Sequence, residues 1–309
     1  MSKNRGLFSP RVFWGKRYEV LDYLISGISL GSVYAIIALG YTMVYGIAKM
    51  LNFAHGDIIM IGGYAAFCTG YYLHWPVWLA VLFAVVVCTV LGVVIEKLAY
   101  KPLRNATSLA VLITAIGVSY FLQNVALLIW TSNPKAFPNM LSFIPYVNIG
   151  RIQITGTALG TVVTCIVVMV ALTLFTDKTK MGKAMRTVSE DKGAASLMGI
   201  NVNGTISLTF AIGSGLAAIA GVLLCSAYPT LMPTTGAMPG IKAFTAAVFG
   251  GIGSIPGAMI GGILLGVIEI FAKAYISTQL SDAIVFAVLI IVLIVKPTGL
   301  LGKKITEKV

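Results

Sequence analysis

The stretch RTVSEDKGAASLMG, residues 186–199, is a polar insertion between two long apolar segments. The flanking segments 156–176 and 205–226 contain no charged residue, whereas the sixteen residues 177–192 contain eight. An apolar run of roughly 18 to 25 residues is long enough to cross a lipid bilayer as a helix. The pattern therefore predicts two membrane-spanning helices joined by a charged loop, and the rest of the chain repeats it.

The composition supports a membrane protein over its whole length. Of the 309 residues, 58% are hydrophobic and only 10% are charged, whereas a soluble domain has about 25% charged residues. The net charge is +12, but 17 of the 22 lysines and arginines lie in four places, at 1–20, 96–104, 177–192 and 296–309. Basic residues beside spans mark the cytoplasmic side and attract anionic lipid. We therefore expect membrane lipid as a partner and no nucleic acid.

Nine apolar segments are visible in the sequence. They lie at about 21–46, 58–73, 77–95, 107–130, 156–176, 205–226, 241–252, 255–276 and 283–296. Backbone groups in lipid must be satisfied within the segment, so the spans are helices. We predict an all-α polytopic membrane protein with about 8–9 membrane-embedded helices, some of them broken or re-entrant. A basic arm (1–20) precedes the transmembrane domain (21–296), which contains a cytoplasmic loop at 177–204, and a basic tail (297–309) follows it.

The basic loops also indicate which ends of the helices face the cytoplasm. Loops 96–104 and 177–204 should both be cytoplasmic, and the two apolar segments between them agree with this. Three apolar segments precede residue 96, so simple counting places the N-terminus outside, although its arm is basic. Either the arm is external, or one early segment is re-entrant and the arm is internal. We favour the external arm, because three full crossings require no re-entrant segment.

The charged loop itself contains the signals of a short helix. Ser189 is a suitable N-cap, Glu190 and Asp191 would complement the helix dipole in the first turn, and Gly199 offers a left-handed stop. The predicted helix, Glu190–Met198, is too short to be stable alone in water. It is therefore either a solvated connector or an element that docks on a cytoplasmic partner. The candidate docking residues are Ser189, Glu190, Asp191, Ala194, Ala195, Leu197, Met198 and Gly199.

Polar residues also interrupt the apolar sequence MLNFAHGDIIMIGGY, residues 50–64. Polar groups at membrane depth are expensive and tend to face a cavity or each other. Asn52 and His55 would share a helix face, whereas Asp57 could cap a helix that starts at Ile58. Three interpretations remain open: a helix cap and bend, a polar patch that lines a pathway, or a proton relay. No third ligand for a metal is apparent, and we expect no metal.

Glycines dominate the sequence AAVFGGIGSIPGAMIGGILLG, residues 246–266. Small residues four apart allow helices to pack closely in lipid, which assigns helix packing to Gly253, Gly257, Gly261, Gly262 and Gly266. Ser254 and Pro256 stand where a helix would break, and a break at membrane depth must lie in protein or face a cavity. Further along, Glu269 and Lys273 are spaced as an i, i+4 ion pair. The glycines lack the Lys-Ser/Thr of a phosphate-binding loop, so this chain shows no ATP site.

Three stretches carry a resemblance to a known family: GSVYAIIALGYTMVYGIAKMLNFAHGDIIMIGGY (31–64), RTVSEDKGAASLMGIN (186–201) and GIKAFTAAVFGGIGSIPGAMIGG (240–262). They resemble, in the same order, the LivH-type permease of bacterial branched-chain amino acid ABC importers. The resemblance runs from about residue 21 to the C-terminus. It implies a multi-pass subunit of the bacterial inner membrane that is not itself an enzyme and binds no cofactor.

The resemblance also implies partners and a mechanism. A second permease subunit, two ATPase subunits that bind ATP, and an extracytoplasmic amino-acid-binding protein would complete the importer. The loop helix would fit a groove on an ATPase, and alternating access would move leucine, isoleucine or valine. The implied pathway residues are Asn52, His55, Asp57, Gly250, Gly251, Gly253 and Ser254. Two alternatives remain: a related permease for urea, short amides or other amino acids, and a secondary transporter in which His55 or Asp57 couples to protons or ions.

Overall fold

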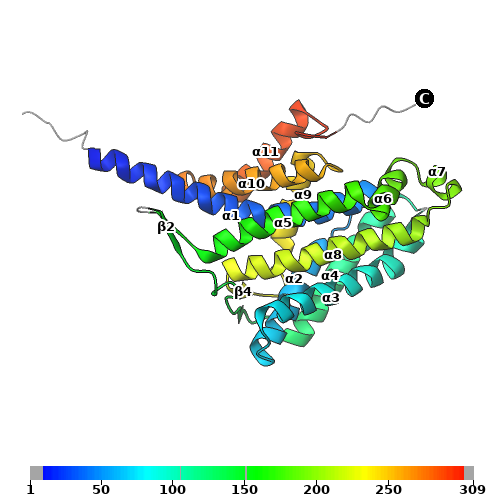
Figure 1. The fold of residues 1–309 in the computed structure, drawn as a ribbon, viewed down its shortest axis with the longest axis horizontal. Coiled ribbons are helices and arrows are strands. Elements are labelled where there is room, and N and C mark those ends of the chain that lie inside the picture. Colours follow the sequence, from blue (N-terminus) through cyan, green and yellow to red (C-terminus); the bar gives the residue numbers. More distant parts are fainter. Residues whose placement is uncertain (1–9, 105, 150–151, 303–309) are drawn as a thin grey trace, which may run out of the picture.

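The computed structural model describes residues 10–104, 106–149 and 152–302, which form a helical bundle with two short pairs of strands (Figure 1). The helices are α1 (Pro10–Ala48), α2 (His55–Phe67), α3 (Val77–Ile95), α4 (Ser108–Trp130), α5 (Gly156–Lys178), α6 (Lys180–Glu190), α7 (Lys192–Leu197), α8 (Val202–Ala227), α9 (Ala237–Gly250), α10 (Ile255–Tyr275) and α11 (Ser281–Val295). Turns of π-helix extend α2 (Cys68–Tyr72) and α3 (Glu96–Tyr100), and a 3₁₀ turn follows at Lys101–Leu103.

Side-chain caps explain where many of these helices begin. An oxygen of the residue before the helix accepts a hydrogen bond from a backbone N–H in the first turn, which satisfies a group that the helix itself leaves unpaired. Such caps stand before α4, α5, α6, α7, α8 and α10, and they are Thr107, Thr155, Thr179, Asp191, Asn201 and Ser254.

Hydropathy correctly predicted the membrane-embedded segments. Within the described residues, six helices are long and apolar enough to cross a membrane: Glu19–Ala48, Val77–Leu103, Ser108–Trp130, Gly156–Lys178, Val202–Ala227 and Ile255–Tyr275. The other three predicted segments correspond to the shorter helices α2, α9 and α11. The predicted fold class, an all-α polytopic membrane protein with some short or broken helices, is confirmed.

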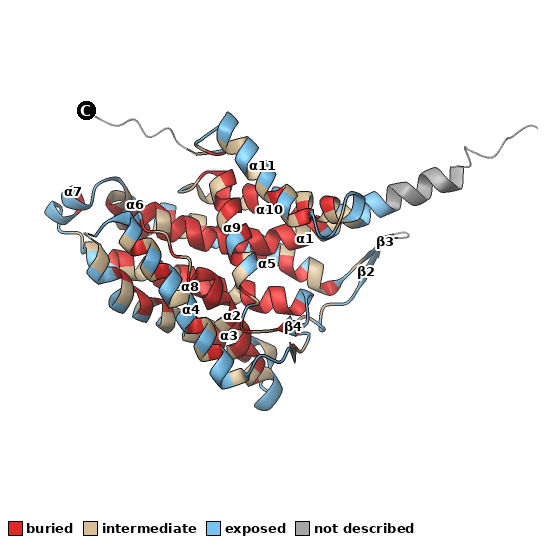
Figure 2. Ribbon diagram, turned by 180° about the vertical axis from the view of Figure 1, so that it is seen from behind, coloured by how far each residue is buried: buried red, intermediate tan, exposed pale blue. Residues whose placement is uncertain are grey.

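Burial separates a central group of helices from a peripheral one (Figure 2). In the most apolar parts of α8 and α1, 78% and 67% of the residues are buried. In the corresponding parts of the spans of α3, α4 and α5, only 28%, 17% and 22% are buried. The peripheral helices therefore present their apolar outer faces to lipid, whereas α1 and α8 form the middle of the bundle. The short helix α2 packs against α8, the short helix α9 packs against α1 and α10, and α2 and α9 contact each other.

The ends of the bundle can be assigned from contacts between the basic loops. The Arg104 guanidinium contacts Asn203, and Lys192 Nζ donates to the Ala48 carbonyl oxygen over 3.0 Å. The end of α1, the loop 96–104 and the loop 177–204 therefore lie together at the end that the positive charge marks as cytoplasmic. This connectivity agrees with an external N-terminal arm. Residues 1–9 of that arm lie outside the described residues, and residues 10–20 continue into α1 without a break.

The opposite, external end carries all four short strands. β1 (Lys135–Ala136) pairs antiparallel with β4 (Thr230–Leu231), and β2 (Val147–Ile149) pairs with β3 (Ile152–Ile154). The β1–β4 pair links the loop after α4 to the connection between α8 and α9. At the cytoplasmic end, residues 300 and 301 of the basic tail donate to the carbonyl oxygens of Phe249 and Gly250, both over 2.9 Å. Residues 303–309 lie outside the described residues.

Candidate functional site

The charged loop at the cytoplasmic end contains two helices rather than the one predicted. Ser189 lies inside α6, where its hydroxyl donates to the Arg186 carbonyl oxygen over 2.7 Å, and Glu190 is the last residue of that helix. The prediction that Ser189 caps a helix Glu190–Met198 is therefore wrong. The physical reason is the buried side of α6, formed by Gly182, Met185 and Val188, which continues the helix past Ser189 by packing it on the bundle.

The cap of the second helix, α7, is Asp191. Its Oδ1 accepts from the backbone N–H groups of Gly193 and Ala194 over 2.7 and 3.0 Å. Gly199 has φ +79° and ends the helical segment in the left-handed region, as predicted. Six residues therefore form a separate helix that projects from the cytoplasmic end of the bundle (Figures 1 and 2).

The tip of α7 exposes two large apolar side chains. Leu197 is 92% exposed and Met198 is 76% exposed, whereas Ala195 is fully buried against the bundle and Ala194 is exposed. These two adjacent residues form an exposed apolar surface at the cytoplasmic end. We define Leu197 and Met198 as the apolar tip of α7.

Lys192 joins α7 to the central helix α1. Its ammonium donates to the carbonyl oxygen of Ala48, the last residue of α1, over 3.0 Å. A lysine near the C-terminus of a helix bonds its unpaired carbonyls and complements its dipole. Burial lowers the pKa of Lys192, and the nearby charges of Arg104 and Lys49 lower it further. This hydrogen bond connects the start of α7 to the end of a central helix.

Replacing Asp191 with alanine should loosen α7 without unfolding the bundle. The change removes both cap hydrogen bonds, and losing such a cap typically costs about 1 kcal/mol. Amide hydrogen exchange over residues 192–198 should become faster by about fivefold, which corresponds to that free energy. Ser189→Ala is the matched control, because the Ser189 hydroxyl bonds within α6. Faster exchange in the Ser189 variant than in the Asp191 variant would contradict the assigned cap.

The polar residues of the stretch 50–64 meet near the start of α2. Asn52 and His55 are 2% and 1% exposed, and Asn52 Oδ1 accepts from the Tyr100 hydroxyl over 2.9 Å. The His55 ring lies 4.6 Å from the ring of Tyr41, between centroids. Within the described residues, Asn52 Nδ2 and His55 Nε2 have no hydrogen-bond partner although both atoms are buried. Such groups normally find a partner or a water molecule.

Asp57 does not have the predicted role of a helix cap. α2 begins at His55 after Ala54, and Asp57 lies in its first turn, where a carboxylate complements the helix dipole. Asp57 Oδ1 accepts from Gln123 Nε2 of α4 over 2.9 Å. Asp57 therefore connects α2 to a peripheral helix. The actual N-cap position, three residues earlier, could not be predicted because Ala54 offers no side-chain oxygen.

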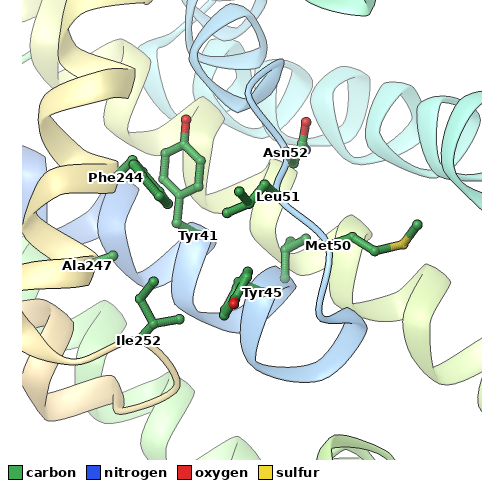
Figure 3. A pocket seen from close by; sticks show the side chains of 9 residues that line it. Tyr41, Tyr45, Met50, Leu51, Asn52, Phe244, Ala247 and Ile252 are labelled. Atoms are coloured by element: carbon green, nitrogen blue, oxygen red, sulfur yellow. The ribbon is translucent and has the colours of Figure 1, made fainter. Parts of the chain in front are cut away.

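A small cavity connects Asn52 with the glycine-rich turn (Figure 3). Its walls come from α1, the segment 50–52, α9 and the turn after α9, and its volume is about 10 Å³. Tyr41, Leu51 and Phe244 face one another in Figure 3, with Ile252 on the side of the turn. A cavity of that size holds about one water molecule. An amino acid could enter here only if the walls of the cavity moved apart.

A turn interrupts the helical structure between α9 and α10, as predicted. α9 ends at Gly250, Ser254 caps α10 by accepting from the Gly257 N–H over 3.2 Å, and Gly251 and Gly253 have φ of +105° and +93°. The predicted packing role of Gly253 is wrong, because a methyl group built on it would meet no atom within 4 Å. It serves the turn instead, since few other residues adopt that φ.

The remaining glycines of the ridge pack on two different helices. Methyl groups on Gly257 and Gly261 would collide with the backbone of α9 at Gly250, whereas those on Gly262 and Gly266 would collide with α1. α10 is therefore held by close backbone contact on two sides, as small residues permit in lipid.

A second cavity lies at the external half of the bundle and contains charged residues. Its volume is about 240 Å³, and it opens between α1, the end of α8, the start of α9 and the end of α10. Glu269 Oε1 accepts from Lys273 over 2.6 Å and from Lys242 over 2.8 Å, and Oε2 accepts from the Tyr34 hydroxyl over 2.9 Å. Lys242 also lies 2.6 Å from Asp282 Oδ1.

Sequence spacing found only part of this charged group. The Glu269–Lys273 pair was predicted, and it forms. Lys242 and Tyr34 were missed because they come from other helices, 27 and 235 residues away in the chain. The available signal was a lysine inside an apolar segment without a local acidic partner.

Comparison with known proteins identifies the family. The profile of the family described as "Branched-chain amino acid transport system / permease component" matches residues 23–293. The chain belongs to this family. The permease BraD of Pseudomonas aeruginosa is 45% identical over 94% of this chain and 99% of its own. LivH of Salmonella typhimurium is 47% identical over 94% and 97%, and a probable LivH of Methanocaldococcus jannaschii is 28% identical over 90% and 91%. Both BraD and LivH carry the description "high-affinity branched-chain amino acid transport system permease protein".

Membership of the branched-chain amino acid permease family fits the architecture. The matched region starts in α1 and ends in α11, so it includes every helix of the bundle. The chain is therefore a multi-pass inner-membrane permease component, and the resemblance seen in the sequence is confirmed. Within this permease, the three features described above occupy different depths: α7 at the cytoplasmic end, the small cavity next to it in the bundle, and the charged cavity in the external half.

Proposed function

We propose that this permease is the membrane subunit of an ATP-driven importer that moves leucine, isoleucine or valine inward by alternating access. It would pair with a second permease subunit, two ATPase subunits would bind ATP below, and an amino-acid-binding protein would dock outside. The family of the whole bundle carries the proposal, because the matched region includes every spanning helix. The substrate class follows from the descriptions of the 45–47% identical relatives.

The structure of the cytoplasmic end supports the proposal that a separate ATPase chain supplies the energy. Leu197 and Met198 are exposed at the tip of α7, and an apolar tip of this kind suits a groove on a soluble partner. The Lys192–Ala48 hydrogen bond then links that tip to α1. The small cavity of about 10 Å³ admits no amino acid in this conformation, so transport requires the bundle to open there. An ATPase that moves α7 would supply that opening.

The test is uptake by the reconstituted complex. Vesicles that contain the permease, its second permease and both ATPases should accumulate radiolabelled leucine when the binding protein is outside and ATP is inside. Vesicles that contain a non-hydrolysable ATP analogue are the control and should not. Uptake that runs on a proton gradient without ATP would overturn the proposal. Uptake of urea with no uptake of leucine, isoleucine or valine would overturn the substrate assignment.

Replacing Lys192 with methionine should weaken coupling. The change removes the charged hydrogen bond between α7 and the Ala48 carbonyl but keeps a long, unbranched side chain. Leucine imported per ATP hydrolysed should fall by a factor of about 5–10, because the hydrogen bond of this exposed lysine should contribute about 1–1.5 kcal/mol, at or below the low end for a charged group. Lys183→Met, an exposed change on α6, is the matched control. An unchanged ratio in the Lys192 variant would show that α7 does not act through α1.

A further inference from the structure

We propose that the charged cavity in the external half of the bundle is a binding site for the zwitterion of an aliphatic α-amino acid. The inference rests on the proposed function, which supplies the class of solute, and it adds the place where the permease itself holds that solute. We call this cavity the outer site. The residues that carry the inference are Tyr34, Lys242, Glu269 and Lys273, together with the apolar wall described below.

The first observation is that charged side chains are buried at positions where neutral side chains would cost less free energy. Lys242 is 6% exposed and Glu269 is 1% exposed, and both lie within apolar helices. Buried ion pairs are weak stabilisers, since apolar residues of similar volume usually serve as well or better. Ionisable residues at membrane depth are rare and costly, and they commonly mark substrate or ion pathways. A function in solute binding explains why this group is charged.

The second observation is that a positive group, Lys273, and a negative group, Glu269, can each form further hydrogen bonds. An ammonium group has three donors, and Lys273 gives only one, to Glu269, within the described residues. Lys273 is also 33% exposed on its side chain, so a ligand can reach it. Glu269 also lines the cavity, and in the described part of the chain its Oε2 accepts only from Tyr34, although each carboxylate oxygen can accept two bonds. The outer site can therefore donate to a carboxylate and accept from an ammonium group at the same time.

The third observation is the electrostatic balance around the cavity. Lys242 and Lys273 carry two positive charges, while Glu269 and Asp282 carry two negative ones. The cavity is also lined by Met238, in the first turn of the fourteen-residue helix α9, where the helix dipole favours a negative group. A neutral zwitterion fits this balance, whereas a solute with a net charge would leave one charge without a partner.

The fourth observation is an apolar wall of suitable size. Leu30, Leu224, Met238 and Pro239 line the same cavity, and its volume is about 240 Å³. Pockets for drug-sized ligands usually measure about 300–1,000 Å³, so this one suits a smaller molecule. We infer that the carboxylate binds Lys273 near the start of α9, the ammonium group binds Glu269 Oε2, and the aliphatic side chain contacts the apolar wall.

Photochemical labelling of the whole complex tests the site. The probe is the diazirine analogue of leucine, irradiated with the complete importer in lipid vesicles, and mass spectrometry locates the adducts. We expect adducts on Leu30, Leu224 or Met238. Unlabelled leucine should suppress them by about tenfold at saturation, whereas 4-methylpentanoate, which lacks the ammonium group, and 3-methylbutylamine, which lacks the carboxylate, should not, because each loses a charged hydrogen bond.

Variants of Lys273 separate binding from folding. Lys273→Met leaves the Lys242–Glu269 pair in place and should lower the adduct yield by about tenfold or more, the loss of a charged hydrogen bond. Lys273→Arg should restore much of it, since arginine also donates to a carboxylate. Lys135→Met, the same change on β1 at the external end, is the matched control and should label like the wild type. Recovery of the second permease and the ATPases with each variant verifies that it folds.

The outcomes distinguish the two proposals. Leucine uptake without adducts at the outer site would overturn this inference and leave the proposed function intact. Suppression by 4-methylpentanoate or 3-methylbutylamine as strong as that by leucine would also overturn it, because the cavity would then bind apolar molecules without regard to charge. Failure of the wild-type complex to import any branched-chain amino acid would instead overturn the proposed function.

Discussion

Replacing Gly266 with leucine should strongly destabilise the folded bundle. A methyl group at this position would already collide with the backbone of Gly31 and with the carbonyl oxygen of Gly27, and backbone cannot rotate away as a side chain can. Overpacking typically costs about 1–3 kcal/mol, and we expect the upper end or more where the obstructing atoms are backbone. Such a loss is a large part of the roughly 5–15 kcal/mol that stabilises a typical protein.

The measurement is the yield and thermal midpoint of the purified complex, detected by size-exclusion chromatography. Gly117→Leu is the matched control, because a methyl group on Gly117 of α4 would meet nothing within 4 Å. That variant should give wild-type yield, since leucine also favours the helix more than glycine does. Equal midpoints for the two variants would show that α1 and α10 are not in close contact.

Replacing both Leu197 and Met198 with aspartate should abolish transport. The two side chains are exposed, so the permease itself loses no packing, but any apolar contact with an ATPase is lost. Burying an aliphatic side chain contributes about 1.5–3 kcal/mol, so losing two should weaken ATPase binding by about a hundredfold or more. Leucine uptake should fall to background while the permease remains folded in the membrane.

The control is Leu301→Asp, the same type of change at another exposed position of the cytoplasmic end. Its ATPase recovery should match that of the wild type, measured by copurification through a tag on the permease. Full ATPase recovery in the Leu197/Met198 double variant would place the contact elsewhere on the loop. This pair tests docking more cleanly than a bulky residue at Ala195, because Ala195 is buried and such a change would also disturb the loop itself.

The sequence alone predicts properties that depend on a window of neighbouring residues. Hydropathy located all nine embedded segments, and the clusters of positive charge assigned the cytoplasmic end. The break at Ser254 and the left-handed stop at Gly199 were also predictable, because each depends on one residue and its neighbours. For the same reason the i, i+4 pair of Glu269 and Lys273 could be found.

Predictions failed where several local signals compete or where the partner is distant. Ser189 and Asp191 are both good caps, and the choice between them was made by the packing of α6, which extends the helix to Glu190. Gly253 has the spacing of a packing ridge but lies in the turn before α10. The outer site draws on α1, α9 and α10, so the contact between Lys242 and Glu269 depends on tertiary structure. The pathway residues Asn52, His55 and the 250–254 turn remain predictions.

The glycine contacts between α1 and α10 also determine which parts of the bundle can move. The van der Waals attraction between two backbones in contact falls steeply when a gap of even about 0.5–1 Å opens. These two helices should therefore move together as one rigid unit. The glycines of α10 also contact the backbone of α9 at Gly250, so α9 should move with α1 and α10, whereas α2 begins after an irregular segment in which Lys49 has the unusual φ of +58°. We therefore expect α1, α9 and α10 to move as one rigid unit when the permease opens, with residues 49–54 as the hinge that connects this unit to α2.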